Sequence, residues 1–141
     1  MIIVDIKGKL HDKDVLGILS QSMYMPTEEK LNLRADEYEA DESVSVLAHV
    51  DGEIVIGVIV VKALTAVSFE ILSIAVESAF RGKGVGSKLI SSFIENFSCR
   101  EICAETDVDA VGFYRNFGFE INSLGEKYPG VIRYLCTLKL S

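Results

Sequence analysis

Three glycines alternate within the segment Arg81–Ser87, which reads Arg-Gly-Lys-Gly-Val-Gly-Ser. An apolar segment suited to a β-strand precedes it, and a segment with helical periodicity follows it. Because glycine has no β-carbon, Gly82, Gly84 and Gly86 are expected to adopt positive φ and to let a ligand approach the backbone closely. Their N–H groups and those at the helix start converge where the helix dipole favours negative charge. The segment therefore predicts a phosphate-binding loop, to which its arginine and Lys83 add positive charge.

Two other glycine-loop patterns fit this segment less well. A Walker-type loop requires Gly-Lys followed by Ser or Thr, whereas Lys83 is followed by Gly84. The dinucleotide pattern Gly-x-Gly-x-x-Gly is nearly matched from Gly82 to Ser87, and Glu105 follows at about the usual spacing of 20 residues. That pattern opens a fold of repeated βαβ units, but a single such unit is predicted here. A glycine-rich helix start without a ligand is the remaining alternative.

The length and charge of the chain limit its class. Its 141 residues suit one domain, predicted to span residues 1–141. The net charge of −7 disfavours nucleic acid or an anionic membrane as a partner. Its apolar runs are far shorter than the ~20 residues that span a bilayer, and the N-terminus does not read as a secretory signal. We therefore expect a cytoplasmic protein without a membrane partner.

Cysteine and histidine give no sign of a metal site. The three cysteines form no Cys-x-x-Cys pair and do not neighbour a histidine, so neither a bound metal nor structural disulfides are expected. His11 and His49 are isolated in the sequence. We expect both to be ordinary residues at the surface or at a sheet edge.

Hydrophobic periodicity and turn residues predict alternating strands and helices. The predicted strands are 2–7, 44–50, 54–61, 68–76, 101–106, 119–122 and 131–140, with a hairpin turn at Asp51-Gly52 and a loop over 123–130. The predicted helices begin near Val15, at Pro26, at Val85 and near Ala110, the last ending at Gly118. A right-handed crossover makes strands 68–76 and 101–106 parallel. The fold class is therefore mixed α/β of the α+β type.

Two motifs, in this order, carry a resemblance to a known family. The first runs from Ile74 to Gly86 and looks like an acetyl-CoA signature, [Arg/Gln]-x-x-Gly-x-[Gly/Ala], satisfied by Arg81, Gly84 and Gly86. The second, Gly-Phe-Tyr-Arg-Asn-Phe-Gly-Phe over residues 112–119, looks like aromatic-Tyr-x-x-x-Gly-Phe. Together with the element order, they resemble the GNAT superfamily of acyl-CoA-dependent N-acetyltransferases.

The resemblance implies a fold and a role for each of several segments of the chain. It implies the GNAT fold: a twisted, mostly antiparallel sheet of about six or seven strands, flanked by about four helices. One parallel βαβ pair would splay apart to form the cofactor cleft. The helical segment 12–40 and the loop 123–130 would flank the acceptor side and set specificity. An exposed terminal strand would be available to pair in a homodimer.

Acetyl-CoA is the co-substrate that the resemblance implies. Free backbone groups of the first parallel strand would bind the pantetheine arm as an added strand, while the glycine-loop amides hold the pyrophosphate. Asp107 stands where relatives often have asparagine, and would contact the cofactor or cap the next helix. The predicted cofactor-binding residues are Ile74, Ala75, Val76, Arg81, Gly82, Lys83, Gly84, Val85, Gly86, Ser87 and Asp107.

Transfer of an acetyl group to an amine requires a proton for the departing thiolate. Tyr114, the tyrosine of the second motif, suits this role of general acid because it is neutral at pH 7. Glu70 ranks first as general base, ahead of Glu77 and Glu105, because it shares alternation parity with the cofactor-binding residue Ile74. An acceptor amine of low pKa would need no side-chain base.

The resemblance leaves the acceptor open between an amine of a small molecule and an amine of a peptide. The alternative function is a non-catalytic acyl-CoA-binding or sensor domain of the same fold, against which the presence of Tyr114 argues. A nucleotide-dependent oxidoreductase is disfavoured because only one βαβ unit is predicted.

Overall fold

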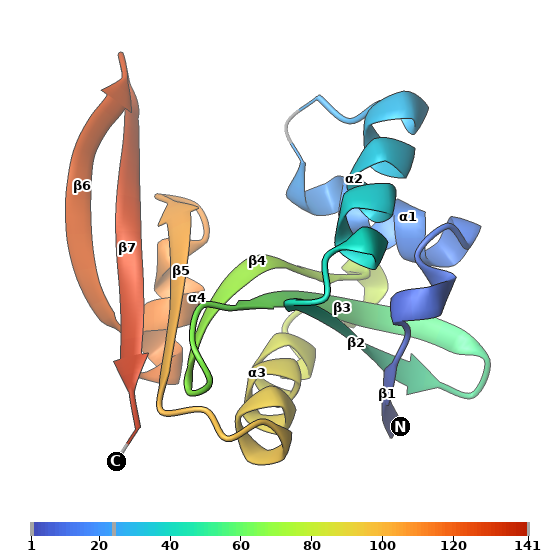
Figure 1. The fold of residues 1–141 in the computed structure, drawn as a ribbon. Coiled ribbons are helices and arrows are strands. Elements are labelled where there is room, and N and C mark those ends of the chain that lie inside the picture. Colours follow the sequence, from blue (N-terminus) through green and yellow to red (C-terminus); the bar gives the residue numbers. More distant parts are fainter. Residues whose placement is uncertain (1, 24, 141) are drawn as a thin grey trace.

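The fold is a seven-stranded sheet with helices on both faces (Figure 1), in a computed structural model that describes residues 2–23 and 25–140. The strand order is β1-β2-β3-β4-β5-β7-β6, and only β4 and β5 pair in parallel. The strands are β1 (Ile2–Asp5), β2 (Val44–Asp51), β3 (Ile54–Ala63), β4 (Ser68–Val76), β5 (Glu101–Asp107), β6 (Glu120–Tyr128) and β7 (Val131–Lys139). The helices are α1 (Lys13–Leu19), α2 (Glu28–Ala40), α3 (Val85–Asn96) and α4 (Val111–Phe117). This arrangement confirms the predicted fold class.

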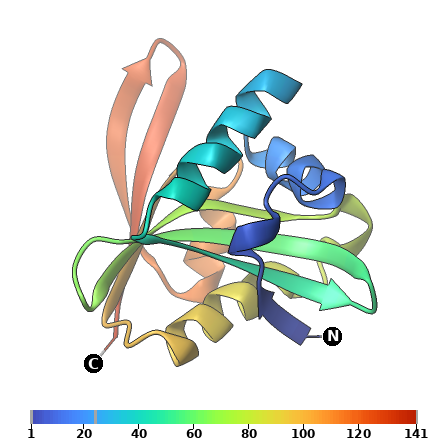
Figure 2. The ribbon, with the colours of Figure 1, turned by 45° about the vertical axis from the view of Figure 1, so that its right-hand side comes forward.

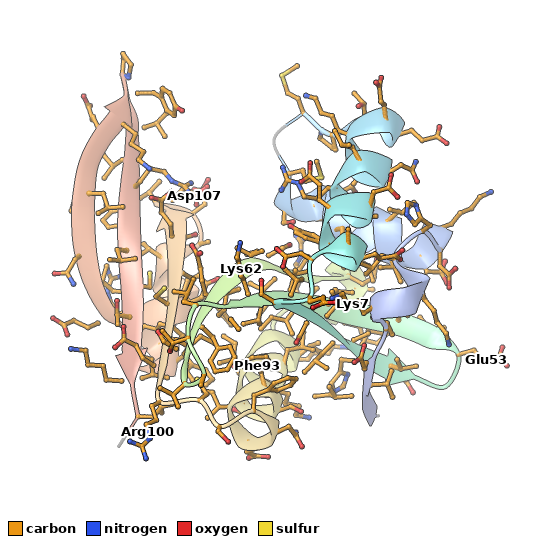
Figure 3. The ribbon with its side chains drawn as sticks, in the orientation of Figure 1. Lys7, Glu53, Lys62, Phe93, Arg100 and Asp107 are labelled. Carbon is orange, nitrogen blue, oxygen red and sulfur yellow. The ribbon has the colours of Figure 1, made fainter. Side chains whose placement is uncertain are left out.

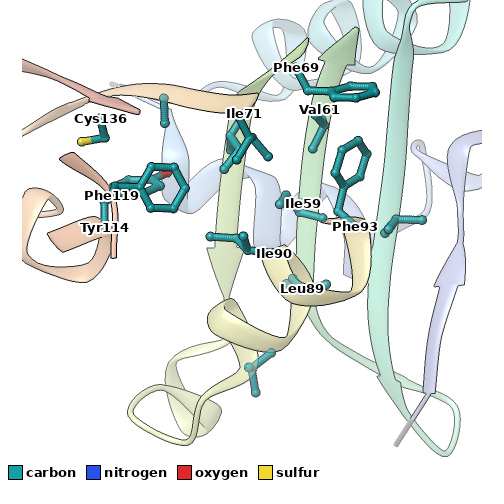
Figure 4. Packing of buried hydrophobic residues seen from close by; sticks show 14 of the residues in the cluster. Ile59, Val61, Phe69, Ile71, Leu89, Ile90, Phe93, Tyr114, Phe119 and Cys136 are labelled. Atoms are coloured by element: carbon teal, nitrogen blue, oxygen red, sulfur yellow. The ribbon is translucent and has the colours of Figure 1, made fainter. Parts of the chain in front are cut away.

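Two buried layers of side chains lie on opposite faces of the sheet. Helices α1 and α2 cover one face, and α3 covers the other (Figures 1 and 2). On the α3 side, Leu89, Ile90 and Phe93 pack against β3 and β4, and this layer extends to Tyr114 of α4 (Figure 4). The second layer, on the α1–α2 side, includes Val58 and other residues of β3. Both faces of the central strands are therefore buried, which explains the nearly continuous apolar sequence of β3.

The β2–β3 hairpin follows its turn chemistry. Asp51 pairs with Ile54, and Gly52 has a φ of 62°, a left-handed conformation that favours glycine. At the N-terminal end of α2, the Thr27 hydroxyl accepts a hydrogen bond from the N–H of Lys30 at 3.1 Å. Local residues thus define both the hairpin turn and the start of this helix.

The predicted loop over residues 123–130 is wrong, because β6 continues to Tyr128 and turns at Pro129 and Gly130. β6 is an edge strand whose residues are almost all exposed, so it lacks the apolar alternation by which a half-buried strand is recognised. The last strand in sequence, β7, lies between β5 and β6, so the two edges of the sheet are the N-terminal strand β1 and β6. At the other end of the chain, β1 stops at Asp5 and a 3₁₀ turn occupies Lys7–Lys9.

None of the helices in the described part of the chain is long and apolar enough to cross a membrane.

His49 is buried, contrary to the expectation from sequence. It lies in β2 at 3% exposure, and its Nδ1 has no hydrogen-bond partner among the described residues. Burial, and then the positive charge of Lys88, lower the pKa of His49 below its usual 6.5, while Asp51 opposes the shift. The imidazole is therefore held in its neutral form.

We predict that His49 makes the protein less stable in mild acid. Because its pKa is lower in the folded state, its contribution to stability is complete above the unfolded value of 6.5 and is lost as the pH falls through the lowered pKa. Urea unfolding at several values between about pH 7.5 and pH 5 should show a smaller acid-induced loss in His49→Leu than in the wild type. His11→Gln is the control, because hydrogen bonding to Asn32 and Asp36 raises the pKa of this exposed histidine. An unchanged acid-induced loss in His49→Leu would contradict the prediction.

Candidate functional site

A cleft of about 940 Å³ opens where β4 and β5 separate. The two strands pair only at Ser68–Glu101, Phe69–Ile102 and Glu70–Cys103. β5 pairs with β7 along its whole length, whereas beyond these three pairs the second half of β4 is left with one neighbouring strand, β3. The cleft is lined by this half of β4, the glycine loop, α4, the end of β5, and parts of β7 and the α1–α2 connection. The strands therefore splay as predicted.

The backbone of β4 presents unpaired polar groups to the cleft. The N–H of Glu77 donates to the C=O of Ile56 at 2.8 Å, which fixes the alternation of hydrogen-bonded pairs between β3 and β4. By that alternation, Ala75 is bonded to Val58, whereas the N–H and C=O groups of Ile74 and Val76 point away from β3. Ile74 and Val76 are therefore available to a ligand as predicted, and the backbone of Ala75 is not.

A β-bulge at Leu72 changes which side chains of β4 share a face. Val60 pairs with Ser73 and Val61 with Ile71, so Leu72 is the extra residue. Ile71 on one side of the bulge and Ile74 on the other both pack into the α3-side core, although they differ in parity. The alternation argument that grouped Glu70 with Ile74 is therefore wrong.

The structure places Glu70 on the α1–α2 face of the sheet, at the closed end of the parallel pair. Its neighbours Phe69 and Ile71 belong to the α3-side core, so alternation directs Glu70 to the opposite face. Its cross-strand partner is Lys62, which lies on the α2 side while Phe93 lies on the α3 side (Figure 3). Glu70 is not among the residues that line the cleft.

The glycine loop has the expected backbone at two of its three glycines. Gly82 and Gly84 have φ values of 76° and 81°, and Gly84 is the N-cap of α3. A β-carbon at either glycine would meet no atom within 4 Å, so both face open space. The first helical bond runs from Lys88 N–H to Gly84 C=O at 3.0 Å, which leaves the preceding N–H groups of the first turn, including that of Ser87, without intrahelical partners.

Gly86 lines the cleft but does not have the positive φ that was predicted for it. It lies inside α3, and a β-carbon there would lie 3.1 Å from the ring of Phe113. Its smallness therefore lets α4 approach α3 closely, beside the cleft. Lys83 is directed to the ring of Phe80, with its Nζ 5.6 Å from the ring centroid, and it does not line the cleft.

Arg81 and a serine pair tie the α1–α2 connection to the cleft. The Arg81 Nε donates to the C=O of Val76 at 3.2 Å, and its guanidinium also donates to Gln21. The hydroxyls of Ser22 and Ser73 are 2.6 Å apart. Sequence reasoning missed this link, because nothing local in the sequence brings the 3₁₀ turn at Ser20–Ser22 next to the bulged strand.

Tyr114 is the buried titratable side chain of the cleft. It is 5% exposed and makes edge-to-face contacts with Phe113 and Phe119, each at 5.2 Å between ring centroids. Burial, reinforced by the neighbouring Cys136, raises the pKa of Tyr114 well above its usual value of 10. The hydroxyl therefore stays protonated at neutral pH and has a proton to donate inside the cleft.

The end of β5 contributes two carboxylates, which have different bonding partners. The Asp107 Oδ1 accepts the N–H groups of Asp109 and Ala110 at 3.0 and 3.1 Å, so this carboxylate caps the turn into α4. Glu105 bonds Lys127 at 2.9 Å and Arg133 at 3.3 Å. These contacts, that with Lys127 most of all, lower the pKa of Glu105. Neither cation was identified from sequence, because the lysine comes from β6 and the arginine from β7, and their positions depend on strand register.

More than half of the chain is similar in sequence to a known protein family. A family model described as an acetyltransferase (GNAT) domain matches residues 41–121. No curated protein matches the sequence.

Several solved structures share the fold. A GNAT family acetyltransferase from Elizabethkingia anophelis with acetyl-CoA bound is 20% identical, with 99% and 97% of the two chains covered and a TM-score of 0.73. An N-acetyltransferase from Staphylococcus aureus is 18% identical, with 99% and 98% covered and a TM-score of 0.74. The aminoglycoside 6'-N-acetyltransferase from Enterococcus faecium is 16% identical, with 99% and 97% covered and a TM-score of 0.74.

We predict opposite effects on stability at two exposed glycines. Gly84→Ala should lower the free energy of unfolding by about 1–2 kcal/mol, because a side chain at positive φ is strained. Gly17→Ala in α1 should raise it by about 0.5–1 kcal/mol, because this glycine is helical and a β-carbon there meets no atom within 4 Å. Urea unfolding measures both values. A stabilising Gly84→Ala would argue against the left-handed loop conformation.

Proposed function

The chain belongs to the GNAT family of acetyltransferases, and we propose that it transfers an acetyl group from acetyl-CoA to a primary amine of a small molecule or peptide. The observation that carries this proposal is one cleft that combines an open strand edge, an amide-lined glycine loop and a protonated tyrosine. The alternative, a non-catalytic acyl-CoA sensor, would have no use for the tyrosine hydroxyl. The acetyl-CoA that is bound in the Elizabethkingia anophelis relative supports the choice of co-substrate.

The cofactor would follow the open half of β4. The backbone groups of Ile74 and Val76 would bond the pantetheine amides, as an added strand would. The pyrophosphate would accept hydrogen bonds from the free amides between Gly82 and Ser87, where open space adjoins the glycines. Arg81 would support the loop through its bonds to Gln21 and Val76, which leave its charge and other guanidinium donors available to phosphate.

The reaction would be a direct attack. The neutral amine nitrogen adds to the thioester carbonyl carbon, and the tetrahedral intermediate collapses as the C–N bond remains and the C–S bond breaks. Tyr114 donates its proton to the departing thiolate sulfur. The attacking nitrogen loses its extra proton to water in the cleft, and the tyrosinate recovers a proton from water, so that the products are a neutral amide and the CoA thiol and Tyr114 returns to its starting form. A backbone N–H of β4 near Val76 would polarise the thioester carbonyl group.

We assign the deprotonation of the amine to water rather than to a carboxylate. Glu70 lies outside the cleft lining. Glu105 lines the cleft, but its two cationic partners make it a weaker base. An acceptor that binds as the neutral amine needs no further base.

We predict that Tyr114→Phe lowers kcat by about 10²-fold or more, the range of a lost general acid, with little change in the affinity for acetyl-CoA. The measurement is release of CoA thiol at saturating acceptor, with acetyl-CoA binding followed by calorimetry. Tyr38→Phe is the matched control, because it removes a hydroxyl from another buried tyrosine that lies outside the cleft. An unchanged kcat in Tyr114→Phe, when chemistry is rate-limiting, would remove the assigned role.

We predict that Gly84→Val abolishes acetyl-CoA binding, because the side chain would fill the space beside the loop amides. Gly130→Val in the β6–β7 turn is the control. It has nearly the same φ, 79° against 81°, and equally open surroundings, but it lies outside the cleft. Calorimetric titration of both variants, after thermal unfolding has verified that they fold, separates backbone strain from loss of the site. Normal binding by Gly84→Val would refute the loop assignment.

A further inference from the structure

The hydroxyl groups of Ser22 and Ser73 form a hydrogen-bonded chain that has one direction. The Ser22 hydroxyl donates its proton to the C=O of Leu19 at 2.9 Å. Because a hydroxyl has one proton to donate, Ser73 is the donor in the 2.6 Å contact between the two serines, and Ser22 is the acceptor. The proton of Ser73 is therefore engaged, and its oxygen can offer a third group only a lone pair.

The Ser73 side chain belongs to the lining of the cleft. The residue is 8% exposed and lines the cleft together with Ser22. It faces the α1–α2 side of the sheet because of the bulge at Leu72, and Leu72 itself, 37% exposed, lines the cleft beside it. Within residues 2–23 and 25–140, the hydroxyl of Ser73 has Ser22 as its one hydrogen-bond partner. The Ser73 oxygen therefore still lacks a donor, which a ligand in the cleft can supply.

Ser73 also lies where the reacting end of the proposed cofactor would arrive. If the pyrophosphate lies at the glycine loop, the pantetheine arm passes Val76 before Ile74, and its thioester end points toward the bulge. Ser73 is the next residue in that direction, about 3.3 Å farther along the strand. Its side chain projects from the face opposite α3, whereas the arm follows the strand edge. An amine that approaches from the α1–α2 side would thus meet the Ser73 oxygen beside the thioester.

We propose that Ser73 binds the acceptor amine: its hydroxyl oxygen accepts a hydrogen bond from an amine N–H and directs the nitrogen lone pair toward the thioester carbon. The inference rests on the proposed acetyl transfer and adds the residue that orients the nucleophile. As the C–N bond forms, the nitrogen gains positive charge and its N–H becomes a stronger donor, so this hydrogen bond is strongest in the transition state. Ser73 keeps its own proton, which it donates to Ser22, and the extra proton of the amine still leaves to water.

Variants of single hydroxyl groups test the inference by release of CoA thiol. The acceptors are ethanolamine, putrescine, L-lysine and the dipeptide glycylglycine, and the one with the highest kcat/KM is used for the variants. We expect Ser73→Ala to lower this kcat/KM about tenfold or more, while the affinity for acetyl-CoA, measured by calorimetry, is unchanged. Ser73→Thr keeps the hydroxyl oxygen and should restore most of the activity that Ser73→Ala loses.

Three further variants separate binding of the amine from a structural role. Ser22→Ala removes the same bond between the serines but leaves the Ser73 oxygen in the cleft, so it should lower kcat/KM by less than about threefold. Ser68→Ala removes a hydroxyl at the other end of β4, outside the cleft, and should leave kcat/KM unchanged. Ser73→Cys, whose sulfur is a weak acceptor, replaces Ser73→Ala if that variant fails to fold.

Equal losses in Ser22→Ala and Ser73→Ala would mean that the serine pair only ties the α1–α2 connection to β4, and would overturn the inference while acetyl transfer stands. An unchanged kcat/KM in Ser73→Ala, or a loss that Ser73→Thr does not restore, would overturn it as well. Acetyl-CoA binding without acetylation of any of the four amines would instead count against the proposed function, and this inference would fall with it.

Discussion

The early end of the β4–β5 pairing is the constraint on which the rest of the site depends. After the Glu70–Cys103 pair, β5 continues beside β7 and leaves half of β4 without a neighbour. The aromatic side chains of α4 pack with Ile71 in the α3-side core and help to hold the strands apart (Figure 4). Backbone N–H and C=O groups of β4 that would otherwise bond a neighbouring strand thereby remain available to a ligand. The glycine loop follows the C-terminal end of β4. The separation of β4 from β5 therefore places the free edge of β4 and the loop amides in the same cleft.

The bulge at Leu72 decides which face of the sheet the side chains of Ser73 and Ile74 take. Ile74 packs toward α3 and offers its backbone to the cleft, whereas Ser73 faces the α1–α2 side and bonds Ser22. Without the extra residue, alternation from Ile71 would turn both of these side chains to the opposite faces.

The sequence was most informative where local chemistry decides the structure. Strand β4 begins and ends as predicted, α3 starts beside the glycine loop, and Gly118 ends α4 with a φ of 119°. Errors arose where tertiary arrangement decides. The bulge overturned the parity assigned to Glu70, and the exposure of β6 hid its continuation to Tyr128. The packing of Phe113 explains why a glycine stands at position 86. Arg133 faces the cleft only because β7 inserts between β5 and β6 in a particular register, which no short motif encodes.

The contacts of Gln21 with Arg81 and of Ser22 with Ser73 join residues 60 and 51 positions apart in the sequence. They make the connection between α1 and α2 part of the same hydrogen-bonded unit as β4 and the glycine loop. The α1–α2 segment therefore cannot be exchanged between relatives independently of β4. A transplanted α1–α2 segment that lacks an amide and a hydroxyl at these two positions would leave Arg81 and Ser73 without these partners, so such an exchange has to include the bulged strand as well.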